Sequence, residues 1–302
     1  MRDIISQKQR LQMCKNNNYI KKLAIFSKQI SSKIFNSCFF TLEIVKSGLF
    51  GKSKMTILFS EKKAWSPEII KGFRFTRHQI TFSKLSSKNI ADYDLVVPLT
   101  VDDLKLLSKT SFITSKNPLP IPSIESIELC DDKYRFNQTI ATNGFGDYIP
   151  QMGGSLSYPY ILKKRIDDWG KNCFIISDKQ QEQTFSDRIN HPDYFCQKLI
   201  PGTREYATHI LVKNKKILHS LNIEYGFSSE FPIKGKEQFL YTRICGCPYL
   251  DLFSEILNSI GFEGLCCVNY KVVNSKPQII EINPRFGGSL SEFFFSFIKY
   301  LN

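Results

Sequence analysis

A strand that ends in Pro-Arg near the C-terminus constrains this chain more than any other feature. Residues Ile279 to Ser289 read Ile-Ile-Glu-Ile-Asn-Pro-Arg-Phe-Gly-Gly-Ser. Side chains alternate along a strand, so Glu281 and Asn283 are predicted to project from one face, about 7 Å apart. Pro284 ends the strand because it has no N–H for the ladder, and Arg285 follows. Oxygen ligands beside a guanidinium predict a site for a divalent cation and a phosphate or carboxylate. The alternative is an edge strand with solvated Glu281 and Asn283.

The remaining sequence alternates between strand and helix patterns, which indicates an α/β (α+β) fold. Over residues 55–125, strand-like runs separated by longer connections predict a small parallel layer. The expected elements are strands at 55–59, Gln79–Phe82 and Leu95–Pro98, a helix at Val101–Ser108 with Thr100 as its N-cap, and a Pro-rich linker at 117–123.

A second α/β region is predicted after the linker. Amphipathic spacing and a following glycine predict helices at Asp131–Asn143, before Gly144, and at Tyr249–Ile260, before Gly261. The expected strands are Tyr160–Lys164 and Cys173–Ile176 as a hairpin, then Phe195–Ile200, Thr208–Val212, Lys216–Leu218, Leu265–Val273 and Gln278–Ile282.

The net charge of +13 belongs mainly to the first 54 residues. They hold eleven Lys or Arg and two acids, and so carry +9 of it. The remainder has an ordinary solubility charge, and we expect no nucleic-acid partner. For residues 1–54, the alternatives are a basic amphipathic helix, a targeting segment or no stable structure. We favour Met55 as the natural start, because a strand pattern begins there.

The cysteine count and the hydropathy pattern indicate where in the cell the chain is located. Nine cysteines are scattered along the chain, and we expect no cleavable signal peptide, which together predict reduced thiols in the cytoplasm. The pairs Cys245/Cys247 and Cys266/Cys267 lack the partners of a zinc site and are interpreted as buried thiols. The sequence contains no run of about 18 apolar residues, so no membrane-spanning helix is predicted.

The Glu-Ile-Asn-Pro-Arg string, preceded by another strand and a helix, resembles the metal-binding end of the ATP-grasp superfamily. Within it the similarity is to the carbamoyl-phosphate synthetase large-subunit and carboxylate–amine ligase type, over residues 55 to 302. The resemblance implies a pre-ATP-grasp Rossmann-like domain at 55–125 and an ATP-grasp domain at 126–302, abbreviated at its C-terminus, after a basic leader at 1–54. It also implies ATP and Mg²⁺ (or Mn²⁺) as cofactors.

The resemblance assigns the metal end of the site first. It implies Glu281 and Asn283 as metal ligands, with Asn269 as a third on the preceding strand, where relatives more often have Glu, Gln or Asp. Arg285 is implied as the catalytic residue that steadies the reacting anion.

The same resemblance assigns the nucleotide contacts. Lys163 and Lys133 match the positions that bind phosphate. Gln197, Lys198 and Ile200 match the adenine hinge, whose backbone groups face the base, and Glu205 matches the ribose contact. The loop between the two strands of the hairpin has one glycine, Gly170, where many relatives have three or four.

The implied reaction is a ligation in which a substrate carboxylate attacks the γ-phosphate and an amine or thiol captures the acyl phosphate. The implied partners are therefore a small carboxylate and an amine, and the sequence is compatible with an oligomer. Two alternatives stay open: a biotin-carboxylase or synthetase fragment that acts with other subunits, and a non-catalytic nucleotide-binding protein with a degenerate site.

Overall fold

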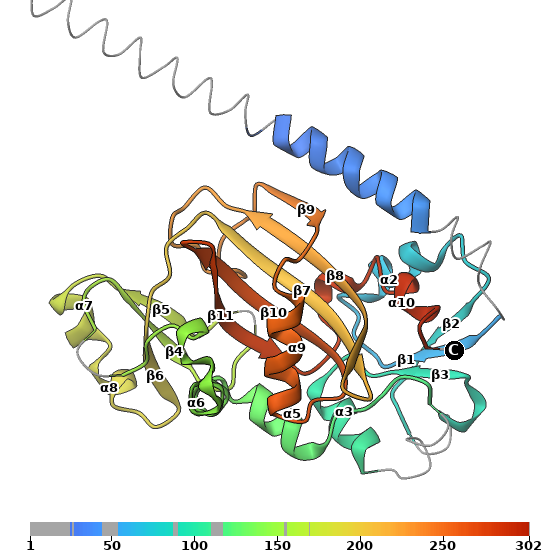
Figure 1. Cartoon of the computed structure of the whole chain (residues 1–302), viewed down its shortest axis with the longest axis horizontal. Coiled ribbons are helices and arrows are strands. Elements are labelled where there is room, and N and C mark those ends of the chain that lie inside the picture. Colours follow the sequence, from blue (N-terminus) through green and yellow to red (C-terminus); the bar gives the residue numbers. More distant parts are fainter. Residues whose placement is uncertain are drawn as a thin grey trace, which may run out of the picture.

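The computed structural model describes residues 25, 27–43, 54–86, 90–109, 117–153, 156–168 and 170–301. Over these residues the chain forms three β-sheets with helices packed against them, which confirms the predicted α/β (α+β) class (Figure 1). No helix in these ranges is long and apolar enough to cross a membrane.

The N-terminal sheet is small and parallel, as predicted. Its order is β2-β1-β3, and Ile57 aligns with Ile80 on one side and Leu95 on the other. The predicted N-cap is also present, because Thr100 and Asp103 form a capping box at the start of α3. The elements here are β1 (Thr56–Phe59), α2 (Ser66–Phe73), β2 (Gln79–Phe82), η1 (Ile90–Asp92), β3 (Leu95–Val97) and α3 (Val101–Ser108).

The predicted helix at Asp131–Asn143 is divided in the structure. Asp132 has extended backbone angles, and its carboxylate accepts hydrogen bonds from the N–H groups of Tyr134 and Arg135. It is therefore the N-cap of a new helix, and the sequence prediction placed the start too early. The elements are α5 (Ile124–Asp131), α6 (Lys133–Ile140), η2 (Ala141–Phe145) and η3 (Gly146–Tyr148).

A second sheet contains the predicted hairpin, β4 and β5, and is antiparallel in the order β5-β4-β6, with β4 at its centre. It lies at the left of Figure 1, in green and yellow. Its elements are β4 (Tyr160–Lys164), β5 (Cys173–Ile176), α7 (Lys179–Thr184), α8 (Ser186–Ile189) and β6 (Tyr194–Lys198).

The largest sheet has five antiparallel strands in the order β11-β10-β7-β8-β9. One face packs on α9 through Phe253, Ile256 and Leu257. Because side chains alternate, the opposite face presents a different set of residues, and the candidate site lies there. The elements are β7 (Arg204–Lys213), β8 (Lys216–Gly226), β9 (Tyr241–Cys245), α9 (Leu250–Ser259), β10 (Gly264–Val273), β11 (Lys276–Asn283), η4 (Gly288–Leu290) and α10 (Phe295–Ile298).

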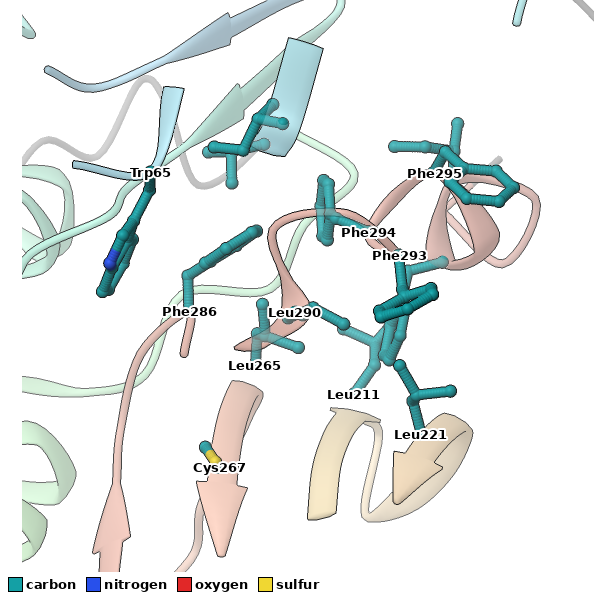
Figure 2. Packing of buried hydrophobic residues seen from close by; sticks show 14 of the residues in the cluster. Trp65, Leu211, Leu221, Leu265, Cys267, Phe286, Leu290, Phe293, Phe294 and Phe295 are labelled. Atoms are coloured by element: carbon teal, nitrogen blue, oxygen red, sulfur yellow. The ribbon is translucent and has the colours of Figure 1, made fainter. Parts of the chain in front are cut away.

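Aromatic packing joins the N-terminal sheet to the segment after β11 (Figure 2). Phe59 of β1 meets Phe294 edge-on at 5.7 Å between ring centroids, and Trp65 lies 5.8 Å from Phe286. Such pairs each contribute about 1 kcal/mol beyond the area that they bury. They fix Trp65 beside the residue that precedes Phe286, which is Arg285.

Residues 27–43 form a helix, drawn in blue in Figure 1, so the helix alternative holds for this part of the leader. Gln29 and Asn36 donate to the carbonyl oxygens of Leu240 and Thr242, and Glu43 pairs with Lys299 at 3.0 Å. Residues 1–24, 26 and 44–53 lie outside the described residues, and the natural start at Met55 stays a prediction.

Candidate nucleotide and metal site

A cavity of about 910 Å³ lies between the small antiparallel sheet and the large sheet, and extends to α2 and the helix over 27–43. The structure brings together every site residue that the sequence analysis named. The ten that line the cavity are Lys133, Lys163, Gln197, Lys198, Ile200, Glu205, Asn269, Glu281, Asn283 and Arg285.

Glu281 on β11 is at the centre of the predicted metal site. Its Oε1 accepts hydrogen bonds from the side-chain amides of Asn269 at 2.8 Å and Asn283 at 2.9 Å. The ammonium of Lys133 lies 3.4 Å from its Oε2. Burial alone would raise the pKa of Glu281, but Lys133 and the two amide donors outweigh it and hold the pKa at about 2. The carboxylate is therefore ionised at any physiological pH.

Lys133 reaches Glu281 because it is the first residue of α6, at the position fixed by the Asp132 cap. Its side chain is buried, and its Nζ also donates to the carbonyl oxygen of Asp167 at 2.6 Å. The cap is held from the other side by the guanidinium of Arg165. The start of α6 is thus tied to the loop between β4 and β5.

Lys163 on β4 is buried and donates to Oε1 of Gln197 on the neighbouring strand β6 at 2.7 Å. The amide of Gln197 in turn donates to the carbonyl oxygen of Pro150 at 3.0 Å. Burial lowers the pKa of Lys163, and the nearby charge of Glu281 opposes that shift. An anion in the cavity would therefore gain strongly from pairing with this ammonium.

The predicted hinge follows β6. The N–H of Lys198 donates to the carbonyl oxygen of Gln151 at 2.8 Å, and the carbonyl oxygen of Ile200 accepts from the ammonium of Lys271 at 3.0 Å. The Lys198 side chain is exposed, whereas Leu199 and Ile200 are buried. The hinge thus lines the cavity with apolar side chains and backbone.

Glu205 at the start of β7 is buried, and its Oε1 lies 3.8 Å from the ammonium of Lys234. Burial raises the pKa of Glu205, and the charges of Lys234 and Lys271 counteract the rise. Lys234 also lies 3.5 Å from Oδ1 of Asn269 and 4.1 Å from the ring centre of Tyr225. It therefore connects the predicted ribose contact to the metal end.

Arg285 is buried directly after β11, and its guanidinium donates to Oδ1 of Asp168 at 2.7 Å. The ring of Trp65 lies near both Arg285 and a second cation, Lys62. The ring centre is 5.7 Å from the Arg285 guanidinium carbon and 3.7 Å from the Lys62 ammonium. Burial, and then the charge of Arg285, lower the pKa of Lys62 to about 8.

The loop with the single glycine approaches the segment between β8 and β9 closely. Gly170 has φ +61°, and a Cβ there would lie 2.9 Å from Cγ2 of Ile233 and 3.2 Å from the carbonyl oxygen of Lys234. A side chain at this position would therefore separate the two segments. Gly170, Ile233 and Lys234 all line the cavity, so this contact forms part of its wall.

Among the described residues, sequence reasoning missed four lysines that line the cavity: Lys33, Lys71, Lys234 and Lys271. Lys271 could have been found, because it follows Asn269 by two residues and so shares its face. Lys33, Lys71 and Lys234 lie outside strands and reach the cavity by tertiary packing alone. Lys62 does not line the cavity, but its ammonium lies over the ring of Trp65, which does. Arg243 of β9 pairs with Glu224 at 2.8 Å and does not line the cavity.

Comparison with known proteins agrees with this geometry. A family model described as an ATP-grasp domain matches residues 130–289, which is more than half of the chain. The chain therefore belongs to the ATP-grasp family, whose cofactors are ATP and Mg²⁺. No curated protein matches the sequence.

Several solved structures are similar to this chain. Phosphoribosylamine–glycine ligase from Thermotoga maritima has a TM-score of 0.60 and 12% identity, covering 78% of this chain and 70% of that one. L-amino acid ligase from Bacillus licheniformis has a TM-score of 0.56 and 14% identity, covering 80% of this chain and 70% of that one. N5-carboxyaminoimidazole synthetase from Staphylococcus aureus, complexed with ADP, has a TM-score of 0.54 and 16% identity, covering 79% of this chain and 73% of that one. At these identities the likeness shows the fold.

Proposed function

We propose that this chain is an ATP- and Mg²⁺-dependent ligase that activates a substrate carboxylate for attack by an amine. The observation that carries the proposal is the cluster around Glu281. An ionised carboxylate, two side-chain amides and the ammonium of Lys133 meet within hydrogen-bond or ion-pair distance on one wall of the cavity. Lys163 lines the same cavity.

The residues present fit a nucleotide-bound magnesium ion. Carboxylate and amide oxygens are hard ligands, and Mg²⁺ commonly takes one or two protein carboxylates together with substrate phosphates and water. We propose Glu281, Asn283 and Asn269 as the protein ligands. Among the described residues no group of three or more His, Cys, Asp or Glu side chains could hold a metal ion alone. This agrees with a cation that phosphate oxygens complete.

The remaining contacts follow from position in the cavity. We propose that Lys133, Lys163 and Lys234 bind phosphate oxygens, because all three line the cavity. Lys133 and Lys163 are buried, and the side chain of Lys234 is 21% exposed. Glu205 would accept hydrogen bonds from ribose hydroxyls. Gln197 would position Lys163, and the Lys198 carbonyl and Ile200 N–H would meet the adenine edge.

Mg·ATP, when bound, supplies the phosphoryl group that turns the carboxylate into an acyl phosphate for the amine to attack. The chain's own contribution is to position the reactants and to offset negative charge with the ammonium groups that line the cavity. Arg285 is proposed to steady the reacting anion, which requires that it exchange Asp168 for that anion. No side-chain nucleophile is proposed.

Domain organisation and setting complete the proposal. Residues 55–125 would be the pre-ATP-grasp domain and 126–302 the ATP-grasp domain. The partners would be a small carboxylate and a small amine in the cytoplasm, without nucleic acid. The charge distribution supports the last point, since residues 1–54 carry most of the net charge.

The neutral Asn269 supports a second candidate, a nucleotide-binding protein without turnover. A screen of ADP release against a panel of carboxylic acids and amines separates the two. A ligase releases ADP only when both substrates are present. If no pair releases ADP while Mg·ATP binds, the second candidate replaces the first.

A further inference from the structure

The large sheet forms one wall of the cavity, and this wall is polar at one edge of the sheet and apolar at the other. Strands β11, β10 and β7 contribute Glu281, Asn283, Asn269, Lys271 and Glu205. Strands β8 and β9 come next in the sheet and contribute mainly apolar surface, at Ile223, Tyr225 and Ile244. Neighbouring strands are about 4.8 Å apart. The apolar wall therefore begins one strand beyond the proposed ribose contact.

Three phenylalanines from other parts of the chain also line the cavity: Phe40 of the helix over 27–43, Phe239 before β9, and Phe293 after β11. Phe239 meets Tyr225 edge-on at 5.4 Å, and Phe40 meets Phe295 edge-on at 5.3 Å. We call the space lined by these side chains the apolar compartment; its residues are Phe40, Ile223, Tyr225, Phe239, Ile244 and Phe293.

The helix over 27–43 is tied to the edge strand of the sheet. The side chain of Asn36 donates to the carbonyl oxygen of Thr242 at 3.1 Å and accepts from the N–H of Ile244 at 3.0 Å. One amide thus satisfies two backbone groups that an edge strand would leave unpaired. Gln29 adds a third bond, to the carbonyl oxygen of Leu240, at 2.6 Å. The helix that carries Phe40 is therefore held at a fixed position along β9.

We propose that the apolar compartment receives the hydrocarbon part of the carboxylate substrate, so that the helix over 27–43 determines substrate specificity. The proposal rests on the proposed function and names the substrate class: a carboxylic acid with an apolar group the size of a short alkyl chain or a phenyl ring. The acid group lies toward Arg285, which lines the same cavity.

The apolar compartment disfavours carboxylic acids that carry a second charged group. A second carboxylate placed among these side chains would lose its hydration. The ammonium of Lys234, which lies over the Tyr225 ring, already faces Glu205 and would have to leave it to pair with that carboxylate. An apolar group gains from leaving water, and each additional buried methylene tightens binding by roughly fourfold. A dicarboxylic acid should therefore bind more weakly than a monocarboxylic acid of the same length.

Binding is measured by calorimetry with the full chain in the presence of Mg²⁺ and a non-hydrolysable ATP analogue. The probes are hexanoate and 3-phenylpropanoate as apolar acids, with acetate and adipate for comparison. The expected result is that both apolar acids bind at least tenfold more tightly than acetate and adipate. Equal or weaker binding of the apolar acids overturns the proposal.

The variant Phe40→Ala removes one wall of the compartment and should weaken 3-phenylpropanoate binding by about tenfold or more. Phe35→Ala is the matched control, because Phe35 belongs to the same helix and is 51% exposed. Thr242→Leu narrows the cavity from the strand side, and it should weaken 3-phenylpropanoate more than acetate. If Phe40→Ala and Thr242→Leu both bind as the wild type does, the compartment is not the binding site.

The same probes with hydroxylamine as the amine, and ADP release as the readout, test the ligase reaction separately. Apolar acids that bind in a Phe40-dependent way but release no ADP would leave the compartment assigned and reject the ligase. ADP release that prefers adipate or acetate would support the ligase and reject the compartment.

Discussion

The ammonium of Lys133 lies 3.4 Å from the carboxylate of Glu281, and the two side chains join the start of α6 to the end of β11. Lys133 is at the first position of its helix because Asp132 caps it. Glu281 faces the cavity with Asn283 because strand side chains alternate. Two local rules of backbone geometry thus place opposite charges at one point, where the proposed reaction needs both a metal ligand and a phosphate contact.

Glu281→Gln should reduce ADP release by about 100-fold or more, because the only carboxylate among the proposed metal ligands is lost. Steady-state ADP release with the substrate pair found in the screen is the measurement. Glu255→Gln is the matched control, since Glu255 is an exposed residue of α9. Turnover within threefold of the wild type in Glu281→Gln would remove this residue from the site.

Lys163→Met should raise the dissociation constant for Mg·ATP by about tenfold, because a buried ammonium that can pair with phosphate is lost. The neighbouring Lys164 is the control: it is next on the same strand, is less buried and does not line the cavity. Titration calorimetry compares Lys163→Met with Lys164→Met. Equal affinities in the two variants would show that Lys163 does not contact the nucleotide.

Lys234→Met tests a residue that only the structure reveals. Its ammonium lies near both Glu205 and Asn269, so its removal should weaken Mg·ATP binding by about fivefold to tenfold. Lys216→Met, at an exposed position of β8, is expected to bind as the wild type does. An unchanged dissociation constant in Lys234→Met would show that this lysine does not contact the nucleotide.

Lys62 predicts a specific dependence of stability on pH. Its native pKa is about 8, below the unfolded value of 10.5, so the unfolded chain binds more protons between these two pH values. The cost of burying the charged lysine is thus full below pH 8 and disappears as the pH rises toward 10.5. Lys62→Met should be more stable than the wild type at pH 7, by on the order of 1 kcal/mol after allowance for solvent screening.

Urea unfolding of both proteins at pH 7 and pH 10 provides the measurement, with the free energy of unfolding compared at each pH. The advantage of Lys62→Met should shrink at pH 10. A difference that is the same at both pH values would mean that Lys62 titrates normally in the folded protein.

The parts of the fold that could be predicted are those with local signals. Strands such as β10 and β11 have long apolar runs and end at turn residues, and α9 has an apolar stripe followed by Gly261. Strand β9 was missed, because its sequence Tyr-Thr-Arg-Ile-Cys is short and mixed. Its place at the sheet edge depends on pairing with β8 and on Asn36, which lies far away in the sequence.

The candidate site divides in the same way. Glu281, Asn283 and Arg285 lie within five residues of one another, so the alternation of the strand and the position of Arg285 just after it were enough to group them. Lys234 comes from a loop between β8 and β9, and its approach to Glu205 depends on how that loop packs. No local pattern contains that information.

The most direct test of the central claim is calorimetric titration of the full chain with ATP, with and without Mg²⁺, in the wild type and in Glu281→Gln. The account predicts that Mg²⁺ tightens ATP binding to the wild type at least tenfold and that Glu281→Gln loses most of this enhancement. Tight ATP binding that is equal with and without Mg²⁺, or no binding at millimolar Mg·ATP, would contradict it.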